Sequence, residues 1–183
     1  MGSFELSIEG SDGVHSAVTY MASVDFERFE QATVNSALVL RIASVQAEIL
    51  VESFMEGFMD RLKDQVIRSP GEEVTVFALN QVESDVDLFI VVANGNGGYV
   101  GKGTVAGRIS QGKLEMETGL QIRSIDASAC DTSPCQNGGS CTSAVMLIDG
   151  ERSIIEGTQK VFSTFPSVAL RSTCECGQGF TGE

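Results

Sequence analysis

The stretch Cys135-Gln136-Asn137-Gly138-Gly139-Ser140-Cys141 decides the class of this protein. Cys130 lies just before it and Cys174-Glu175-Cys176 follows after a long gap, so all five cysteines fall in the last third of the chain. A small segment with this many cysteines has too little apolar core to fold alone and depends on disulfides, which persist in oxidising compartments. The sequence therefore predicts a small disulfide-bonded module in an extracellular setting.

Zinc binding is the alternative reading of a cysteine cluster. The usual Cys-x₂-Cys spacing and a nearby histidine are absent, because His15, the single histidine, lies far away in the sequence. We predict that His15 is a solvated side chain and that the cysteines hold no metal.

Composition limits the partners of the chain. Its 183 residues suffice for one ordinary domain and a small appendage, and the first 129 residues contain no cysteine. The formal net charge is −13, from 25 acidic and 12 basic residues. A surface this acidic repels nucleic acid and anionic lipid, so neither is expected as a partner. No apolar run approaches the roughly 20 residues that span a bilayer.

The cysteine-free part alternates between strand and helix patterns. Apolar and β-branched runs predict strands, and three- and four-residue apolar spacing predicts helices. The order is strand 38–42, helix 47–67, strand 74–79, strand 86–93, helix 103–116 and strand 120–125. This order predicts an α+β, ferredoxin-like antiparallel sheet with two helices on one face, whose other face needs cover or a polar surface. A further strand is predicted at 17–24.

Each predicted helix has an apolar stripe that we assign to the core rather than to a ligand groove. In the first helix the stripe consists of Val51, Phe54, Met55, Phe58, Met59, Leu62 and Val66. In the second it consists of Val105, Ile109 and Met116, and Gly107 and Gly112 weaken that helix.

The cysteine pattern resembles an epidermal-growth-factor-like (EGF-like) module that stops before its sixth cysteine. The resemblance implies disulfides Cys130–Cys141 and Cys135–Cys174, with Cys176 left unpaired by truncation. It also departs from the usual module, because 32 residues separate Cys141 from Cys174. The apolar residues of this insertion, Ile154, Ile155, Phe162 and Phe165, are expected to pack on the neighbouring domain or on each other. Reduction is expected to loosen residues 130–183 and to leave the cysteine-free domain folded.

A second resemblance rests on Ala37-Leu38-Val39-Leu40-Arg41-Ile42, residues 54–58, Asp87-Leu88-Phe89-Ile90-Val91, residues 162–164 and residues 173–176. With the cysteine pattern, these stretches are similar to the membrane-proximal ectodomain of large cadherins of the Fat, Flamingo/seven-pass and invertebrate classical types. This resemblance implies three parts: the tail of a preceding cadherin repeat or a linker at 1–30, a SEA-like domain at 34–127, and the EGF-like module at 128–183.

The resemblance implies a non-enzymatic spacer in the extracellular part of a plasma-membrane adhesion receptor. The expected partners are other cadherin ectodomains in cis or in trans, reached through the parent protein, with no small-molecule substrate. Attachment to the membrane would come only from a transmembrane segment outside this chain.

Calcium is expected in the preceding repeats of the parent protein and not in this fragment. No Asp-x-Asn-Asp-Asn linker motif is present, and the residues before Cys130 lack the acidic pair of calcium-binding EGF-like modules. Asp126 alone cannot supply the six or more oxygens that calcium prefers. The fragment is therefore expected to need no cofactor.

Two further patterns are assigned to the surface. Gly101-Lys102-Gly103-Thr104 is no phosphate loop, because Asn96 and Gly103 stand where glycine and a hydroxyl residue are required. Asp85 and Asp87 fall on one face of a strand near Glu83, and without a visible partner they are predicted to form a solvated edge.

The turn between the two central strands carries the alternative function. SEA domains that cleave themselves do so in this turn, at a glycine followed by serine; here Glu83 and Ser84 occupy those positions. The hydroxyl is present, whereas a β-carbon at position 83 disfavours the strained backbone. We therefore expect an intact chain. The alternatives are a self-cleaving SEA module that lets the receptor split, and an extracellular matrix or mucin-like binding module.

Overall fold

The computed structural model describes residues 2–10, 18–26, 31–131, 135, 139–156 and 162–175. The chain divides into two units, residues 1–30 and 31–183, each of which is described by itself. In the first unit, β1 (Gly2–Gly10) pairs antiparallel with β2 (Val18–Phe26), and the register runs from Gly2 opposite Phe26 to Gly10 opposite Val18. β2 overlaps the strand predicted at 17–24, whereas the sequence pattern did not predict β1.

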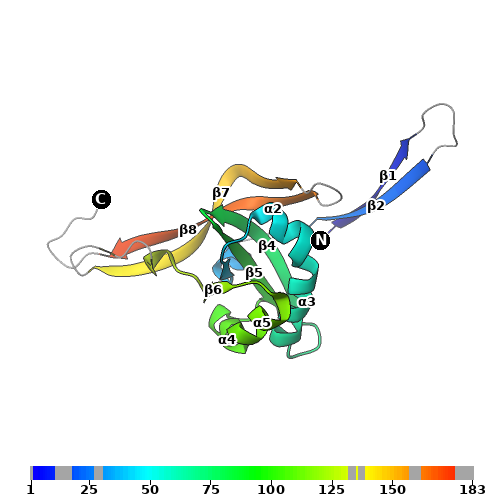
Figure 1. Cartoon of the computed structure of the whole chain (residues 1–183). Coiled ribbons are helices and arrows are strands. Elements are labelled where there is room, and N and C mark those ends of the chain that lie inside the picture. Colours follow the sequence, from blue (N-terminus) through cyan, green and yellow to red (C-terminus); the bar gives the residue numbers. More distant parts are fainter. Residues whose placement is uncertain are drawn as a thin grey trace. The chain divides into compact units, whose positions relative to one another are not determined.

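The second unit is built on a four-stranded antiparallel sheet (Figure 1). After the short helix α1 (Gln31–Asn35), its strands are β3 (Leu38–Ile42), β4 (Glu73–Val82), β5 (Asp85–Ala93) and β6 (Ile122–Ile125). Their order in the sheet is β4-β5-β3-β6, and every neighbouring pair is antiparallel. The predicted mixed α+β class with antiparallel sheets is confirmed. β5 is central, and its continuous apolar run is buried on both faces.

The first predicted helix is present but is not regular. It consists of α2 (Ala47–Ile49), the π-helical segment η1 (Leu50–Phe54) and α3 (Met55–Val66). Phe58, Leu62 and Val66 are fully buried, as predicted. The prediction for Phe54 was wrong, since 37 % of this residue is exposed and Leu50 is buried instead. A π-helical turn holds more residues than an α-helical one, which shifts the side chains out of the regular apolar stripe.

The second predicted helix is split into α4 (Lys102–Arg108) and α5 (Gln111–Thr118). Val105 and Ile109 are buried as predicted, but Met116 is 79 % exposed and Leu114 takes the core position. The break changes the helical phase, so a stripe extrapolated through it points to the wrong residue. At the break, the buried Gln65 accepts a hydrogen bond from the Ser110 backbone N–H at 2.8 Å.

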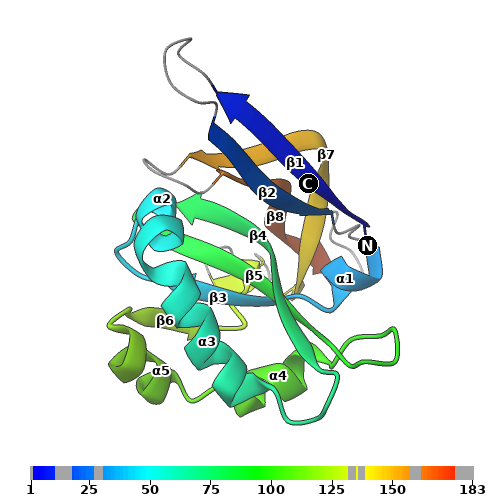
Figure 2. The ribbon, with the colours of Figure 1, turned by 90° about the vertical axis from the view of Figure 1, so that its right-hand side faces the viewer.

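The helices from α2 to α5 cover one face of the sheet, which we call the helix-covered face (Figure 2). Its core contains Leu38, Leu40, Ile42, Phe58, Leu62, Val66, Val86, Leu88, Ile90, Val92, Val105 and Leu114. Arg108 links the end of α3 to α4, since its guanidinium donates to Val66 O at 2.8 Å and to Glu72 at 2.9 Å. The backbone N–H of Arg68, and then the Arg108 side chain, hold the pKa of Glu72 below its ordinary value.

The long insertion between the cysteines forms a hairpin. β7 (Ser140–Glu156) and β8 (Phe162–Glu175) pair antiparallel, with an irregularity between Leu147 and Arg152. The hairpin lies across the sheet from α3 (Figure 2). Val168 of β8 is buried, and its backbone oxygen accepts a hydrogen bond from the Asn80 side chain of β4. The predicted packing of Ile154, Ile155, Phe162 and Phe165 lies outside the side chains that the structure describes.

We call the second side of the sheet the hairpin-covered face. Val39, Phe77, Phe89 and Val91 are all buried there, and the rings of Phe77 and Phe89 meet edge to face with centroids 6.1 Å apart. The sequence required either cover or a polar surface for this face, and the hairpin supplies cover.

Candidate functional site

The turn between β4 and β5 is tight and strained. Val82 ends β4, Asp85 begins β5, and only Glu83 and Ser84 connect them. Glu83 has a φ of 55°, in the left-handed region that residues with a β-carbon rarely occupy. Holding such a residue there costs roughly 1–2 kcal/mol. Glu83 therefore adopts this conformation although its β-carbon disfavours it.

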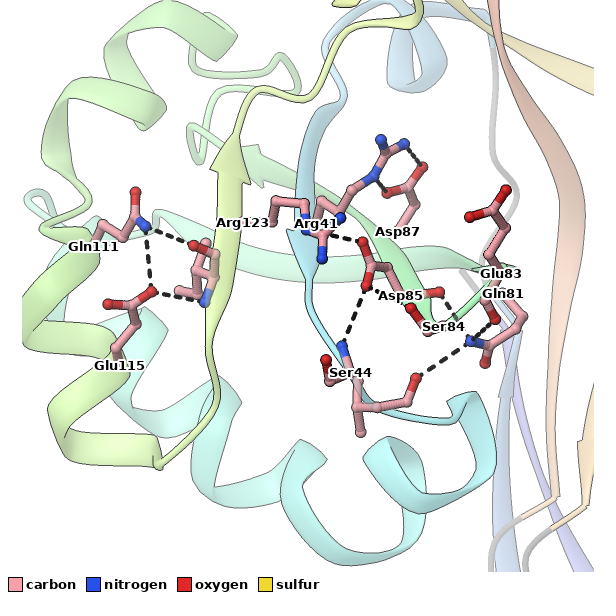
Figure 3. A network of polar contacts seen from close by, with 12 residues as sticks. Arg41, Ser44, Gln81, Glu83, Ser84, Asp85, Asp87, Gln111, Glu115 and Arg123 are labelled. Carbon is pink, nitrogen blue, oxygen red and sulfur yellow. Dashed lines mark hydrogen bonds and ion pairs between the residues drawn. The ribbon is translucent and has the colours of Figure 1, made fainter. Parts of the chain in front are cut away.

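The side chain of Gln81 holds the turn in this conformation (Figure 3). Its amide nitrogen lies 3.1 Å from Glu83 O, 2.9 Å from Asp85 O and 3.3 Å from Val45 O. A carboxamide has two N–H groups, so these three carbonyls compete for them. The amide oxygen of Gln81 accepts from the Ala47 N–H at 2.8 Å. One side chain therefore connects the turn to the start of the first helix.

The Asp85 carboxylate is the second fixed element of the turn. Its Oδ1 accepts from the Ser84 hydroxyl at 3.3 Å and from the Ser44 backbone N–H at 3.2 Å. Its Oδ2 lies 3.1 Å from Nε of Arg123, on β6. The hydroxyl of Ser84 is therefore directed to a carboxylate that is ion-paired with an arginine.

Asp87 has a separate partner on the neighbouring strand. The guanidinium of Arg41 donates to both of its carboxylate oxygens, at 2.6 and 2.7 Å, and Arg41 lies opposite Asp87 in the β3–β5 register. The hydrogen bond to Asp87 raises the pKa of Arg41 above its ordinary value. The predicted solvated edge was wrong: Asp85 is 5 % exposed and Asp87 is 2 % exposed. The central position of β5 buries both carboxylates and requires paired cations.

Sequence reasoning missed Arg41, Gln81 and Arg123. A signal for Arg41 existed, because a single basic residue within the apolar strand 38–42 needs a carboxylate partner if that strand is central. Gln81 and Arg123 gave no such signal, since Ala47, which Gln81 binds, and Asp85, which Arg123 binds, are distant from them in sequence.

This arrangement combines three groups that an internal acyl transfer requires. Ser84 supplies a hydroxyl next to the Glu83 carbonyl, Asp85 can accept the hydroxyl proton, and Gln81 donates to the carbonyl oxygen. Ser84 also lines an open groove with Ser44, Phe54 and Leu120, which lets water reach the turn. The two aspartates are an unsuitable pair for a cation, because each is already paired with an arginine.

The cysteines form a second candidate centre. The structure contains Cys130–Cys141 and Cys135–Cys174, the same two pairs that the EGF-like resemblance implies, and Cys141 lies opposite Cys174 in the hairpin register. The sulfurs of Cys135, Cys141 and Cys174 lie within 4.8 Å of one another. As disulfide sulfurs they offer no thiolate for a metal. Cys176 lies outside the described residues.

The glycine-rich stretch that begins at Gly101 was the remaining candidate from the sequence, and its described contacts are structural. Gly101 immediately precedes α4, and Lys102 pairs with Asp126 at 3.3 Å rather than facing a phosphate site. His15 lies outside the described residues. Among the helices that the structure describes, none has the length and apolar character that a membrane crossing requires.

The amino-acid sequence of the chain is similar to that of known proteins. Protocadherin Fat 4 of Mus musculus is 28 % identical to the chain over 183 residues, and that of Homo sapiens is 26 % identical over 189 residues. Each alignment covers 99 % of this chain and 4 % of the relative, so the chain spans about 4 % of the length of these proteins. No protein-family model matches the chain, and no solved structure matches it. The chain is therefore related over nearly its full length to one region of a Fat-type cadherin.

Proposed function

We propose that this Fat-cadherin-related region is a non-enzymatic, extracellular spacer of a cadherin-type adhesion receptor. Residues 34–127 are a SEA-like domain, and residues 128–183 are an EGF-like module whose insertion covers that domain. Two observations support the first assignment: the helices and strands follow the order β-α-β-β-α-β, and the strands take the order β4-β5-β3-β6. The two disulfides support the second assignment.

The disulfide connectivity is the observation that carries the spacer role. Cys135 and Cys174 are 39 positions apart in sequence but joined covalently, so tension along the chain passes through this bond. The whole hairpin between them is outside the loaded path. It can therefore stay packed on the sheet through Val168 and Asn80 while the chain carries force.

A force experiment tests this role. The chain is stretched by its ends between two marker domains, first oxidised and then as the variant Cys135→Ser with Cys174→Ser. We expect the variant to gain on the order of 100 Å of extension at 3.3–3.6 Å per residue. Because Cys130–Cys141 remains intact, residues 141–174 enter the loaded path and residues 130–135 leave it. Cys130→Ser with Cys141→Ser is the control, because Cys135–Cys174 still shields the hairpin. Equal extension in the oxidised chain and the test variant would rule the spacer mechanism out.

We propose that calcium binding, adhesion and membrane attachment are functions of other parts of the parent protein. Its preceding repeats would hold calcium, its partners would be other cadherin ectodomains in cis or in trans, and a transmembrane segment elsewhere would anchor it. The acidic surface, with a net charge of −13, is compatible with a spacer that does not adhere to anionic lipid.

Self-cleavage at the Glu83–Ser84 bond is the second candidate function, and the geometry of the turn favours it. The Ser84 oxygen would attack the Glu83 carbonyl carbon and form an ester, while Asp85 accepts the hydroxyl proton and passes it to the departing nitrogen of Ser84. Water then hydrolyses the ester. The positive φ of Glu83 stores strain that the broken peptide bond would release.

Denaturing electrophoresis of freshly purified protein separates the two candidates. The spacer proposal expects one band near 19.4 kDa. Self-cleavage expects two fragments that elute together on a sizing column and that disappear in Ser84→Ala. The control is Ser69→Ala, which removes an exposed hydroxyl away from the turn.

A further inference from the structure

The loop between β5 and α4 contains two asparagine–glycine pairs, Asn94-Gly95 and Asn96-Gly97. In such a pair the backbone nitrogen of glycine can attack the carboxamide carbon of the preceding asparagine, because glycine has no side chain to shield its own nitrogen. Whether the reaction occurs depends on how freely each carboxamide and each glycine can move. The structure gives the two neighbouring pairs opposite environments.

Asn94 is held in place. Its Oδ1 accepts hydrogen bonds from the Asn96 N–H at 3.0 Å and the Gly98 N–H at 3.1 Å, and its own N–H donates to Gly98 O at 2.9 Å. Gly95 is equally restrained, since a β-carbon built on it would lie 3.0 Å from Gly71 O. Attack on Asn94 therefore requires the carboxamide to leave two backbone donors and the glycine to leave a close packing contact.

Asn96 is free of these restraints. It is exposed, and its carboxamide makes no hydrogen bond with any residue that the structure describes. Gly97 has a φ of 80°, and a β-carbon built on it would meet nothing within 4 Å. The backbone at Gly97 is therefore uncrowded.

We propose that Asn96-Gly97 is a site of spontaneous deamidation and that Asn94-Gly95 is protected by the fold. The Gly97 nitrogen bonds to Cγ of Asn96, the bond from Cγ to the side-chain nitrogen breaks, and ammonia leaves with the proton that the Gly97 nitrogen loses. Water then opens the cyclic imide at either carbonyl and leaves aspartate or isoaspartate. The overall reaction consumes one water and releases one ammonia.

The modification goes beyond the proposed spacer function, because it acts on a surface loop that the spacer argument does not use. Each event adds one negative charge to a chain whose net charge is already −13. The isoaspartate product also adds one methylene to the main chain at position 96. Because Asn94 and Gly98 close the loop before and after this position, the change stays within the loop. In a long-lived extracellular protein, the fraction of molecules modified at position 96 would therefore increase with the age of the protein.

Site-resolved mass spectrometry of the whole folded chain, incubated at neutral pH, tests the proposal. We expect aspartate and isoaspartate to accumulate at position 96, and at position 94 at least about tenfold more slowly, because two hydrogen bonds must break first. In urea the two positions should react at comparable rates. Asn96→Gln, which would require a larger and slower ring, should abolish the modification at position 96, whereas Asn94→Asp should not slow the reaction at 96. Equal rates in the folded chain, faster reaction at Asn94, or no reaction at Asn96 would each overturn the proposal.

Discussion

The two faces of the four-stranded sheet are closed in different ways. The helix-covered face is covered by helices that follow strands β3 and β5 in sequence. Its core is mainly apolar, and Gln65 of α3 is a buried polar side chain there. The hairpin-covered face is sealed by a segment from the far end of the sequence, held by two disulfides, and it buries the ion pair Arg41–Asp87 among its apolar residues. Local amphipathic pattern suffices for the first face. The second face needs long-range covalent closure and charge pairing.

Truncating the core of the helix-covered face should have the largest effect. Phe58 is 1 % exposed, so Phe58→Ala should leave a cavity and cost about 3–5 kcal/mol in the free energy of unfolding, a large share of the total for one domain. Urea unfolding measures this loss. It should be the same with the disulfides intact or reduced if the two faces are independent. Glu56→Ala, at an exposed position of the same helix, is the control. An unchanged midpoint in Phe58→Ala would mean that this helix face is misassigned.

Releasing the hairpin should have the next largest effect. The variant Cys135→Ser with Cys174→Ser opens a long loop and should cost about 2–4 kcal/mol. Because Val168 packs on the sheet, we expect faster hydrogen exchange in β5 as well as in the hairpin. The expectation from sequence was that the cysteine-free domain stays folded on reduction; faster exchange in β5 would show in addition that it is loosened.

The shorter disulfide provides the control for the hairpin variant. Cys130–Cys141 joins residues 11 positions apart, so removing it should cost about 1 kcal/mol less in the chain-entropy model. If β5 exchanged at the same rate in the oxidised chain and in the variant without Cys135–Cys174, the sheet would not depend on the hairpin.

Breaking the buried ion pair should cost less than either of these changes. Arg41→Met leaves the nearly inaccessible Asp87 carboxylate without its bidentate partner, and we expect a loss of about 2–3 kcal/mol in urea unfolding. The double variant Arg41→Met with Asp87→Leu should recover most of this loss, because no unpaired charge remains. The exposed pair Arg61–Asp64 is the control, and Arg61→Met should change little. A double variant less stable than Arg41→Met alone would show that the pair itself is required.

The smallest effect should be a change in acid stability on the helix-covered side. The pKa of Glu72 is lowered in the fold, so its stabilising contribution is present above the unfolded value of about 4.3 and is lost as the pH falls through the lower folded value. Glu72→Gln should therefore flatten the fall in stability below that pH. Thermal melting across pH 2–7 measures the slope. Glu73→Gln removes an exposed neighbouring carboxylate and should leave the slope closer to wild type; equal slopes in all three proteins would contradict the prediction.

Part of the fold and of the candidate site could be predicted from the sequence, and particular residues show where the prediction stopped. The strands 38–42 and 86–93 and the buried positions Phe58, Leu62 and Val105 followed from local periodicity, which is why they agree with the structure. The predicted burial of Phe54 and Met116 was wrong, because a π-helical turn and a helix break shift the phase of that periodicity. The predicted solvent exposure of Asp85 and Asp87 was wrong, because their burial depends on strands and a hairpin that are distant in sequence.

The sequence by itself determined the order of strands and helices over residues 38–125, the mixed α+β class and the cysteine-rich character of the last third, because each depends on residue type and short-range spacing. Only the tertiary structure decided what covers the second face of the sheet and which cations pair with its buried carboxylates. It also decided that Glu83 adopts a positive φ, because Gln81 and the short turn impose this conformation from outside the residue. The physical reason is that desolvation and strain are set by neighbours in space, and most of these neighbours are distant in sequence.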